Sequence, residues 1–106
     1  MSTIDETTYH QRIDALMSAW EAALDQADTD LDYEITGGIL TVSSPTGKVI
    51  VSRQTPTREV WVAAKSGGYH FRETAGEWRD TRDGMPLQAR LEALLRAIAG
   101  CSIRLS

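Results

Sequence analysis

Between residues 31 and 80 the chain consists of short segments in which apolar and polar residues alternate, separated by tight turns. An alternation with period two is typical of strands that bury one face. The turns, among them Gly37-Gly38 and Ala75-Gly76, are too short for the crossover connection that a parallel pair needs. We therefore expect five or six antiparallel strands. The expected ranges are 31–36, 39–44, 48–53, 59–65, 69–73 and a short strand around Trp78.

Two apolar stripes at helical spacing flank these strands. Thr3 to Glu6 reads T-I-D-E, a capping box that predicts a helix start with Glu6 in the third helical position. The apolar stripe that follows comprises Tyr9, Ile13, Leu16, Met17, Trp20, Leu24 and Ala27. A second helix is expected from about Pro86 to a stop at Gly100. Its stripe comprises Leu87, Leu91, Leu94, Leu95 and Ile98.

The order helix, antiparallel sheet, helix predicts an α+β fold. Each helix must bury its stripe, so we expect a two-layer sandwich in which both helices cover one face of the sheet. A chain of 106 residues that is 42% hydrophobic suffices for one core. Residues 1–106 are therefore expected to form a single domain.

The composition argues against a disulfide-bonded, secreted or membrane-spanning protein. Cys101 is the only cysteine, which rules out an internal disulfide and fits a reducing compartment. The first ten residues lack the basic and apolar regions of a signal peptide, and no run approaches the roughly 18 apolar residues of a membrane span. We expect a cytoplasmic protein with no membrane partner.

Charge is distributed unevenly along the sequence. Residues 1–34 contain nine acids and one base, a net charge of −8, whereas residues 35–106 contain six acids and ten bases. The acidic half disfavours nucleic acid as a partner and suits cations or basic protein surfaces. We call its densest part the acidic ridge. The ridge comprises Glu21, Asp25, Asp28, Asp30, Asp32 and Glu34.

Carboxylates are suitable ligands for hard cations and for high-spin iron. Neighbouring side chains on one face lie about 7 Å apart on a strand and about 5–6 Å apart on a helix. Such spacing predicts weak, largely hydrated binding at several positions. Asp28, Asp30 and Asp32 reproduce the opening of an EF-hand, but that loop requires a glycine and a glutamate where this chain has Tyr33 and Ile39.

No residue is expected to be catalytic. His10 and His70 lack a cysteine partner or an H-x-x-x-H spacing, the serines lack a G-x-S-x-G turn, and Gly67-Gly68 does not open a helix. Trp61 is the most informative aromatic residue. If its neighbours Val60 and Val62 face the helices, it lies on the opposite face.

An exposed tryptophan near Arg53 and Gln54 would be a binding anchor, because large aromatics and arginine dominate interface energetics. The alternative is that Trp61 only packs against its neighbours in the sheet. We therefore treat Arg53, Gln54 and Trp61 as the candidate contacts of a protein partner.

Over nearly its whole length the chain resembles the frataxins, most closely their bacterial CyaY branch. The resemblance rests on the acidic first helix, the hairpin LDYEITGGILTV of residues 31–42, the run RQTPTREVWVAAKSGGYHF of residues 53–71, and Trp78 with Asp80 and Gly84. Within the middle run, Gln54, Pro56, Trp61, Gly68 and Phe71 have the spacing of the family. Ser52 and Glu59 stand where that family commonly has asparagine and glutamine.

The resemblance implies a frataxin-like fold and a role in iron–sulfur cluster assembly. It implies weak binding of Fe²⁺ or Fe³⁺ at the acidic ridge, where other divalent cations could substitute, and docking on the cysteine desulfurase and its scaffold protein. We expect a monomer, with oligomers only in the presence of iron. Two alternatives stay open: a ferroxidase that stores iron, and an interaction domain with incidental metal affinity. A ferroxidase would need a defined site, and the sequence has no Glu-x-x-His pair.

Overall fold

The computed structural model describes residues 4–26, 31–100 and 105. Its elements are α1 (Glu6–Gln26), β1 (Asp32–Thr36), β2 (Ile39–Ser44), β3 (Gly47–Gln54), the short 3₁₀ helix η1 (Thr55–Thr57), β4 (Glu59–Ala64), β5 (Gly67–Thr74), β6 (Glu77–Asp80) and α2 (Leu87–Ala99). Two helices and six strands confirm the predicted α+β fold. The sheet is at the upper end of the expected strand number.

Every strand pairs antiparallel with the next one along the chain, so the sheet is a meander in the order β1 to β6. Tight turns produce this topology, as expected. Gly37 and Gly38 have φ values of +60° and +78°, the left-handed conformation that a two-residue hairpin turn requires. Ala64 pairs with Gly67, so Lys65 and Ser66 make the turn that was expected one residue later. The glycines there begin β5.

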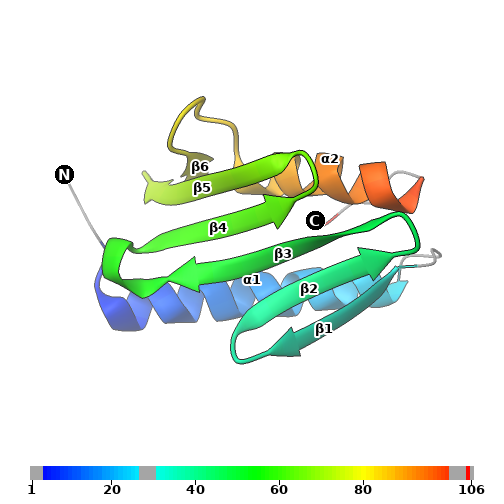
Figure 1. Ribbon diagram of the computed structural model, residues 1–106. Coiled ribbons are helices and arrows are strands. Elements are labelled where there is room, and N and C mark those ends of the chain that lie inside the picture. The colour runs from blue at the N-terminus through cyan, green and yellow to red at the C-terminus, as the bar shows by residue number, and fades with distance from the viewer. Residues whose placement is uncertain (1–3, 27–30, 101–104, 106) are drawn as a thin grey trace.

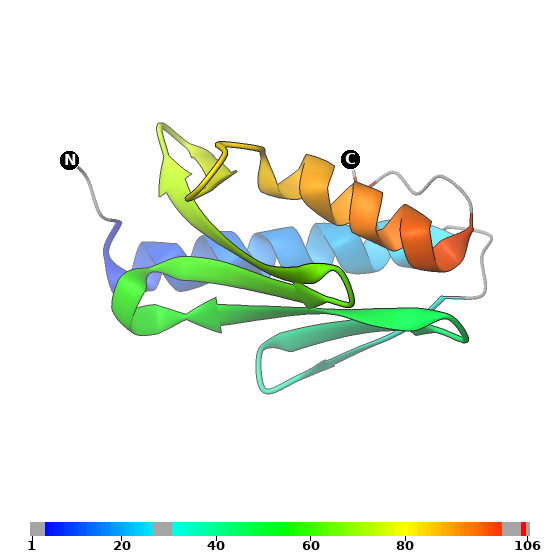
Figure 2. The same cartoon turned by 45° about the horizontal axis from the view of Figure 1, so that its top comes forward.

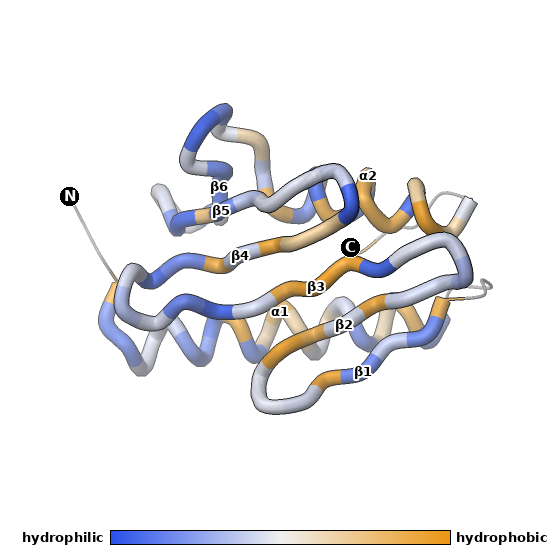
Figure 3. The backbone as a smooth tube through the Cα atoms, viewed as in Figure 1, coloured by the Kyte–Doolittle hydropathy of each residue, from blue (hydrophilic) through white to orange (hydrophobic). Residues whose placement is uncertain are grey.

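Both helices lie on one face of the sheet (Figure 1), and a rotated view separates the two layers (Figure 2). The core lies between the layers because each strand places alternate residues toward the helices. Figure 3 shows apolar residues gathered along the central strands. Among the described residues, the buried apolar side chains are Tyr9, Ile13, Met17, Trp20, Leu24, Leu40, Val42, Val49, Val51, Val60, Val62, Phe71, Trp78, Leu87, Leu91, Leu95 and Leu105.

Helix α1 starts differently from the prediction. Its first residue is Glu6, and the Asp5 carboxylate accepts the Thr8 amide at 2.8 Å. Asp5 is therefore the N-cap, and Glu6 is the first rather than the third helical residue. Aspartate is among the best N-cap residues, so a capping box at Thr3 was not needed. Thr3 itself lies outside the described residues.

Helix α2 matches its prediction more closely. Pro86 precedes its first turn. Gly100 closes the helix with φ +73°, and its backbone amide donates a hydrogen bond to the Arg96 carbonyl. Beyond the helix, Leu105 is 4% exposed, and its amide donates to the Glu92 carboxylate at 2.8 Å. No helix of the described residues is both long and apolar enough to cross a bilayer.

Strand alternation creates two faces that differ in composition. The covered face is the one under α1 and α2. The open face is the opposite one, which points toward the viewer in Figure 1 and is free of both helices. From the strand register, the open face carries Asp32, Glu34, Thr41, Ser43, Lys48, Ile50, Ser52, Gln54, Glu59, Trp61, His70 and Arg72.

Candidate functional site

The acidic ridge follows two elements. Glu21 and Asp25 are exposed on α1, and Asp32 and Glu34 are exposed on β1. The two β1 carboxylates lie on the open face, whereas α1 lies beneath the covered face. The described part of the ridge therefore bends around the β1 edge of the sheet. Asp28 and Asp30, which complete it, lie outside the described residues.

Tyr33 connects the two parts of the ridge. Its neighbours in β1 face the opposite way, and its hydroxyl donates to the Asp25 Oδ1 at 2.5 Å. That hydrogen bond is the main reason that the pKa of Tyr33 is raised to about 12, with further contributions from burial and from the charges of Asp25 and Glu21. At neutral pH the phenol is protonated, and the bond ties the end of α1 to the edge strand.

The described ridge carboxylates differ from most other acids of the chain. None of the four forms a salt bridge with a base among the described residues. Negative charge without a basic partner attracts mobile cations. Within the same part of the chain, no three His, Cys, Asp or Glu side chains gather closely enough to hold a metal ion. The described part of the ridge is a dispersed negative surface, which suits hydrated cations and basic proteins.

The three candidate partner contacts do not share one face. Arg53 pairs with Val60 in the register and points toward α1. Its guanidinium lies 2.9 Å from the Asp14 Oδ1 and 3.0 Å from the His10 Nδ1. A Cβ added at Gly38 would lie 3.3 Å from its Nε, so the glycine leaves room for the arginine. In this structure Arg53 ties β3 to α1 and packs beside the first hairpin turn.

Gln54 and Trp61 lie together on the open face, on neighbouring strands. Trp61 is half-buried, which lies between the two alternatives of an exposed anchor and a residue packed only against its neighbours in the sheet. Two neighbours cover part of the Trp61 side chain. Its ring stacks on His70 with centroids 4.2 Å apart, and its indole N–H donates to the Glu59 Oε1 at 2.8 Å. Arg72 donates to the other oxygen of Glu59 at 2.6 Å.

Glu59, His70 and Arg72 were not predicted as neighbours of Trp61. Glu59 could have been found, because residues two apart on a strand share a face. His70 and Arg72 could not, because their positions depend on the pairing of β4 with β5.

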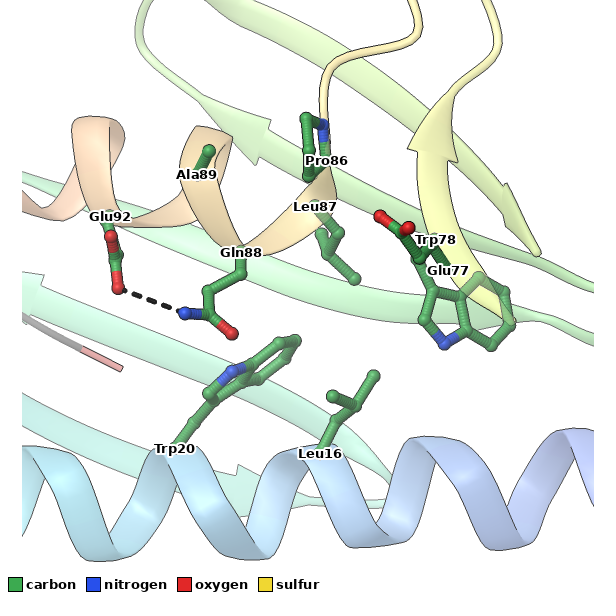
Figure 4. A pocket seen from close by; sticks show the side chains of 9 residues that line it. All are labelled: Leu16, Trp20, Glu77, Trp78, Pro86, Leu87, Gln88, Ala89 and Glu92. Atoms are coloured by element: carbon green, nitrogen blue, oxygen red, sulfur yellow. Dashed lines mark hydrogen bonds between the residues drawn. The ribbon is translucent and has the colours of Figure 1, made fainter. Parts of the chain in front are cut away.

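A groove of about 370 Å³ lies between the two helices, on the far side of the molecule from the open face (Figure 4). Its lining is mostly apolar and includes Leu16 and Trp20 of α1 and Leu87 of α2. Figure 4 also shows the hydrogen bond between Gln88 and Glu92 at its rim. None of the residues predicted to bind metal or a partner lines it.

Comparisons with known proteins agree on one family. The model of the frataxin-like domain matches residues 2–101. The iron–sulfur cluster assembly protein CyaY of Paraburkholderia phymatum is 45% identical over 98 residues, which are 92% of this chain and 93% of the relative. CyaY of Vibrio cholerae is 42% identical over 90 residues, or 84% and 86% of the two chains.

Solved structures with the same fold include a frataxin from Psychromonas ingrahamii. Its TM-score is 0.90 at 26% identity, with 97% of this chain and 99% of that chain covered. A trimeric frataxin from Saccharomyces cerevisiae, complexed with ferrous iron, matches with a TM-score of 0.69 at 25% identity, covering 95% and 91% of the two chains.

Proposed function

The chain belongs to the frataxin family, in its bacterial CyaY branch, and from this we propose that it acts in iron–sulfur cluster assembly as a docking protein. In this proposal it holds iron loosely at the acidic ridge and docks on the cysteine desulfurase and its scaffold protein. It changes the rate of the assembly reaction by favouring one arrangement of that complex and performs no covalent chemistry itself. Residues 1–106 act as one monomeric domain in the bacterial cytoplasm.

The observation that carries the proposal is the composition of the open face. Asp32 and Glu34 on β1 share this face with Gln54 on β3 and Trp61 on β4, and neither helix covers it. Adjacent strands are about 4.8 Å apart, so β1 and β4 are separated by roughly 14 Å. A protein interface of ordinary size spans that distance. One partner surface can therefore contact the carboxylates and the tryptophan together.

Electrostatics support the same proposal. Ridge carboxylates without a basic partner produce a negative potential, which increases the rate of encounter with a basic patch on another protein. Their oxygens also suit Fe²⁺ and Fe³⁺ as hard cations, and other divalent cations could replace iron there. The yeast relative complexed with ferrous iron supports iron as the ion. Dispersed carboxylates favour a loosely held, hydrated ion over a tightly bound cofactor.

A residue-resolved NMR titration tests both parts. Fe²⁺ is added under anaerobic conditions, followed by the cysteine desulfurase and then its scaffold. We expect iron to broaden signals of the acidic ridge, and the desulfurase to affect the ridge together with Gln54 and Trp61. A sample in which Asp32 and Glu34 are replaced by Asn and Gln should lose part of both responses. A Glu77→Gln sample is the control, because Glu77 is an exposed acid of β6 already paired with Arg79.

Three outcomes would contradict parts of the proposal. If iron leaves the ridge signals unchanged, the metal role fails and the chain is an interaction domain. If the desulfurase changes only signals of the helices, the open face is not the docking surface. Oxygen uptake in proportion to added Fe²⁺, lost when Asp25 becomes Asn, would favour the ferroxidase alternative.

A further inference from the structure

We infer that Glu59 is a positioning residue of the docking surface, whose buried carboxylate holds the Trp61 indole and the Arg72 guanidinium in one fixed arrangement. The inference rests on the proposed function, because it takes Trp61 as the residue that the partner contacts. It goes beyond that function by assigning the orientation of Trp61 to a residue that need not touch the partner.

Glu59 is unusual among the acids of this chain because its side chain is buried. Among the described residues only two acids are buried, Glu59 and Asp80, each 6% exposed. Asp80 has a clear structural use, because its Oδ1 accepts the amides of Arg82 and Asp83 in the turn after β6. Glu59 uses both of its oxygens on side chains of the open face. A buried carboxylate is costly unless it is paired, so these partners determine its position.

Each oxygen of the Glu59 carboxylate has its own partner. The Glu59 Oε1 accepts the Trp61 Nε1 at 2.8 Å, and its Oε2 accepts an Arg72 nitrogen at 2.6 Å. Trp61 follows Glu59 by two residues on β4, and Arg72 lies directly opposite Glu59 on β5. The backbone pairing therefore brings the three side chains together. Hydrogen bonds to an ionised carboxylate are the stronger kind, and they restrict the rotation of both partners.

His70 completes the arrangement from the other side of the indole. It lies opposite Trp61 in the register, and the two rings are nearly parallel, at 9°. The indole is thus held at its N–H by Glu59 and at one ring face by His70. Because the N–H is already bonded, a partner meets Trp61 by apolar contact rather than as a hydrogen-bond donor. An anchor that is ordered before binding loses less entropy when it docks.

The protonation state agrees with this role. Burial raises the pKa of Glu59, but the hydrogen bonds from Trp61 and Arg72 and the nearby charge of Arg72 together outweigh it, so the pKa lies below its ordinary value of 4.5. The titratable groups on β5 and β6 beside this cluster are His70, which also lowers the pKa of Glu59, and Arg79, which lies opposite Arg72 and pairs with Glu77. Because the pKa of Glu59 is lower in the folded state, ionised Glu59 contributes fully to the free energy of unfolding above pH 4.5. This contribution is lost as the pH falls through the lowered pKa.

Two substitutions separate the two bonds. Glu59→Gln replaces one acceptor oxygen by an NH2 group, so either Trp61 or Arg72 loses the acceptor that it uses in the parent. Glu59→Ala serves neither. We expect Glu59→Ala to weaken binding to the desulfurase and scaffold by about 2- to 10-fold, the loss expected when one side chain must be ordered on binding. Glu59→Gln should lie between it and the parent. Glu77→Gln removes the same single negative charge, but from β6. This variant should bind the desulfurase and scaffold with the affinity of the parent.

The decisive measurement needs no partner. NMR relaxation of the three indole N–H groups reports their mobility, with Trp20 and Trp78 as buried references and Trp61→Phe for assignment. We expect the Trp61 indole to be as rigid as the references in the parent and mobile on the nanosecond timescale in Glu59→Ala. Its signal should also shift when Glu59 is protonated below pH 4.5.

The outcomes distinguish this inference from the proposed function. A mobile Trp61 indole in the parent overturns the inference even if Glu59→Ala fails to fold. Unchanged indole mobility or unchanged affinity in a folded Glu59→Ala protein overturns it as well. If the parent chain does not bind the desulfurase, the proposed function fails instead, and with it the claim that Glu59 prepares a docking surface.

Discussion

The two faces of the sheet are built from the same strands and differ in almost every other respect. On the covered face Leu40, Val51, Val62 and Phe71 are at most 1% exposed. On the open face the side chains are mostly polar, and even Trp61 is half-buried. One backbone therefore carries a face that stabilises the fold and a face that is available to a partner. Neighbouring residues of a strand lie on opposite faces and therefore have different roles.

The largest effect that follows from this difference is on the covered face. Phe71→Ala removes a fully buried ring and should lower the free energy of unfolding by about 3–5 kcal/mol. Denaturant unfolding measures the loss. The affinity of the molecules that remain folded for the desulfurase should not change. A stability loss below about 1 kcal/mol would mean that Phe71 is not in the core.

The matching substitution on the open face is Trp61→Ala. We expect it to weaken desulfurase binding by about 2 kcal/mol, roughly 30-fold, because tryptophan is a frequent interface anchor. Its effect on unfolding should be smaller, about 1–2 kcal/mol, from the lost contacts with His70 and Glu59. Calorimetric titration and denaturant unfolding of the same samples compare the two. Unchanged affinity would remove Trp61 from the docking surface.

A substitution of Arg53 tests whether this residue stabilises the covered face although its neighbour Gln54 lies on the open face. Arg53→Met keeps most of the side-chain volume but loses the bonds to His10 and Asp14. Because the Asp14 side chain is exposed, we expect a modest loss of stability, about 1–2 kcal/mol. Arg96→Met, at an exposed position of α2, is the matched control. A loss of desulfurase affinity that exceeds the loss of stability would return Arg53 to the docking surface.

The smallest effect concerns the acidic edge between the two faces. Replacing Glu21, Asp32 and Glu34 by the corresponding amides should raise stability by about 1 kcal/mol, because carboxylates without basic partners repel one another. For a domain of this size the melting temperature should rise by roughly 4–8 °C. Glu77→Gln should give no rise, since its carboxylate is paired. No rise in the triple variant would mean that the ridge charges are compensated.

The sequence predicted the elements more accurately than their contacts. Strand 39–44 and the turn at Gly37-Gly38 were predicted where the structure has them. Periodicity and turn residues are local signals, so they survive without knowledge of the fold. The start of α1 was missed because Asp5 competes with Thr3 for the same role.

The candidate site was only partly predictable for the same reason. The exposure of Glu21, Asp25, Asp32 and Glu34 follows from local spacing. The grouping of Arg53 with Gln54 ignored that neighbours on a strand point in opposite directions. Arg53 follows Val49 and Val51 in steps of two residues, so all three side chains lie on the same face of the strand. This spacing is visible in the sequence and would have placed Arg53 toward the helices. Its bonds to His10 and Asp14 cross about 40 residues of sequence, and no local signal indicates them.

By itself the sequence determined the family, the class of fold and the dense negative charge of the first 34 residues. These depend on residue types and on spacing within a few positions. Only the tertiary structure decided that the described ridge bends around the β1 edge, that Arg53 and Trp61 lie on opposite faces, and that Glu59 holds the indole between β4 and β5. Such relations depend on strand register and helix packing, which bring together residues that are far apart in the chain.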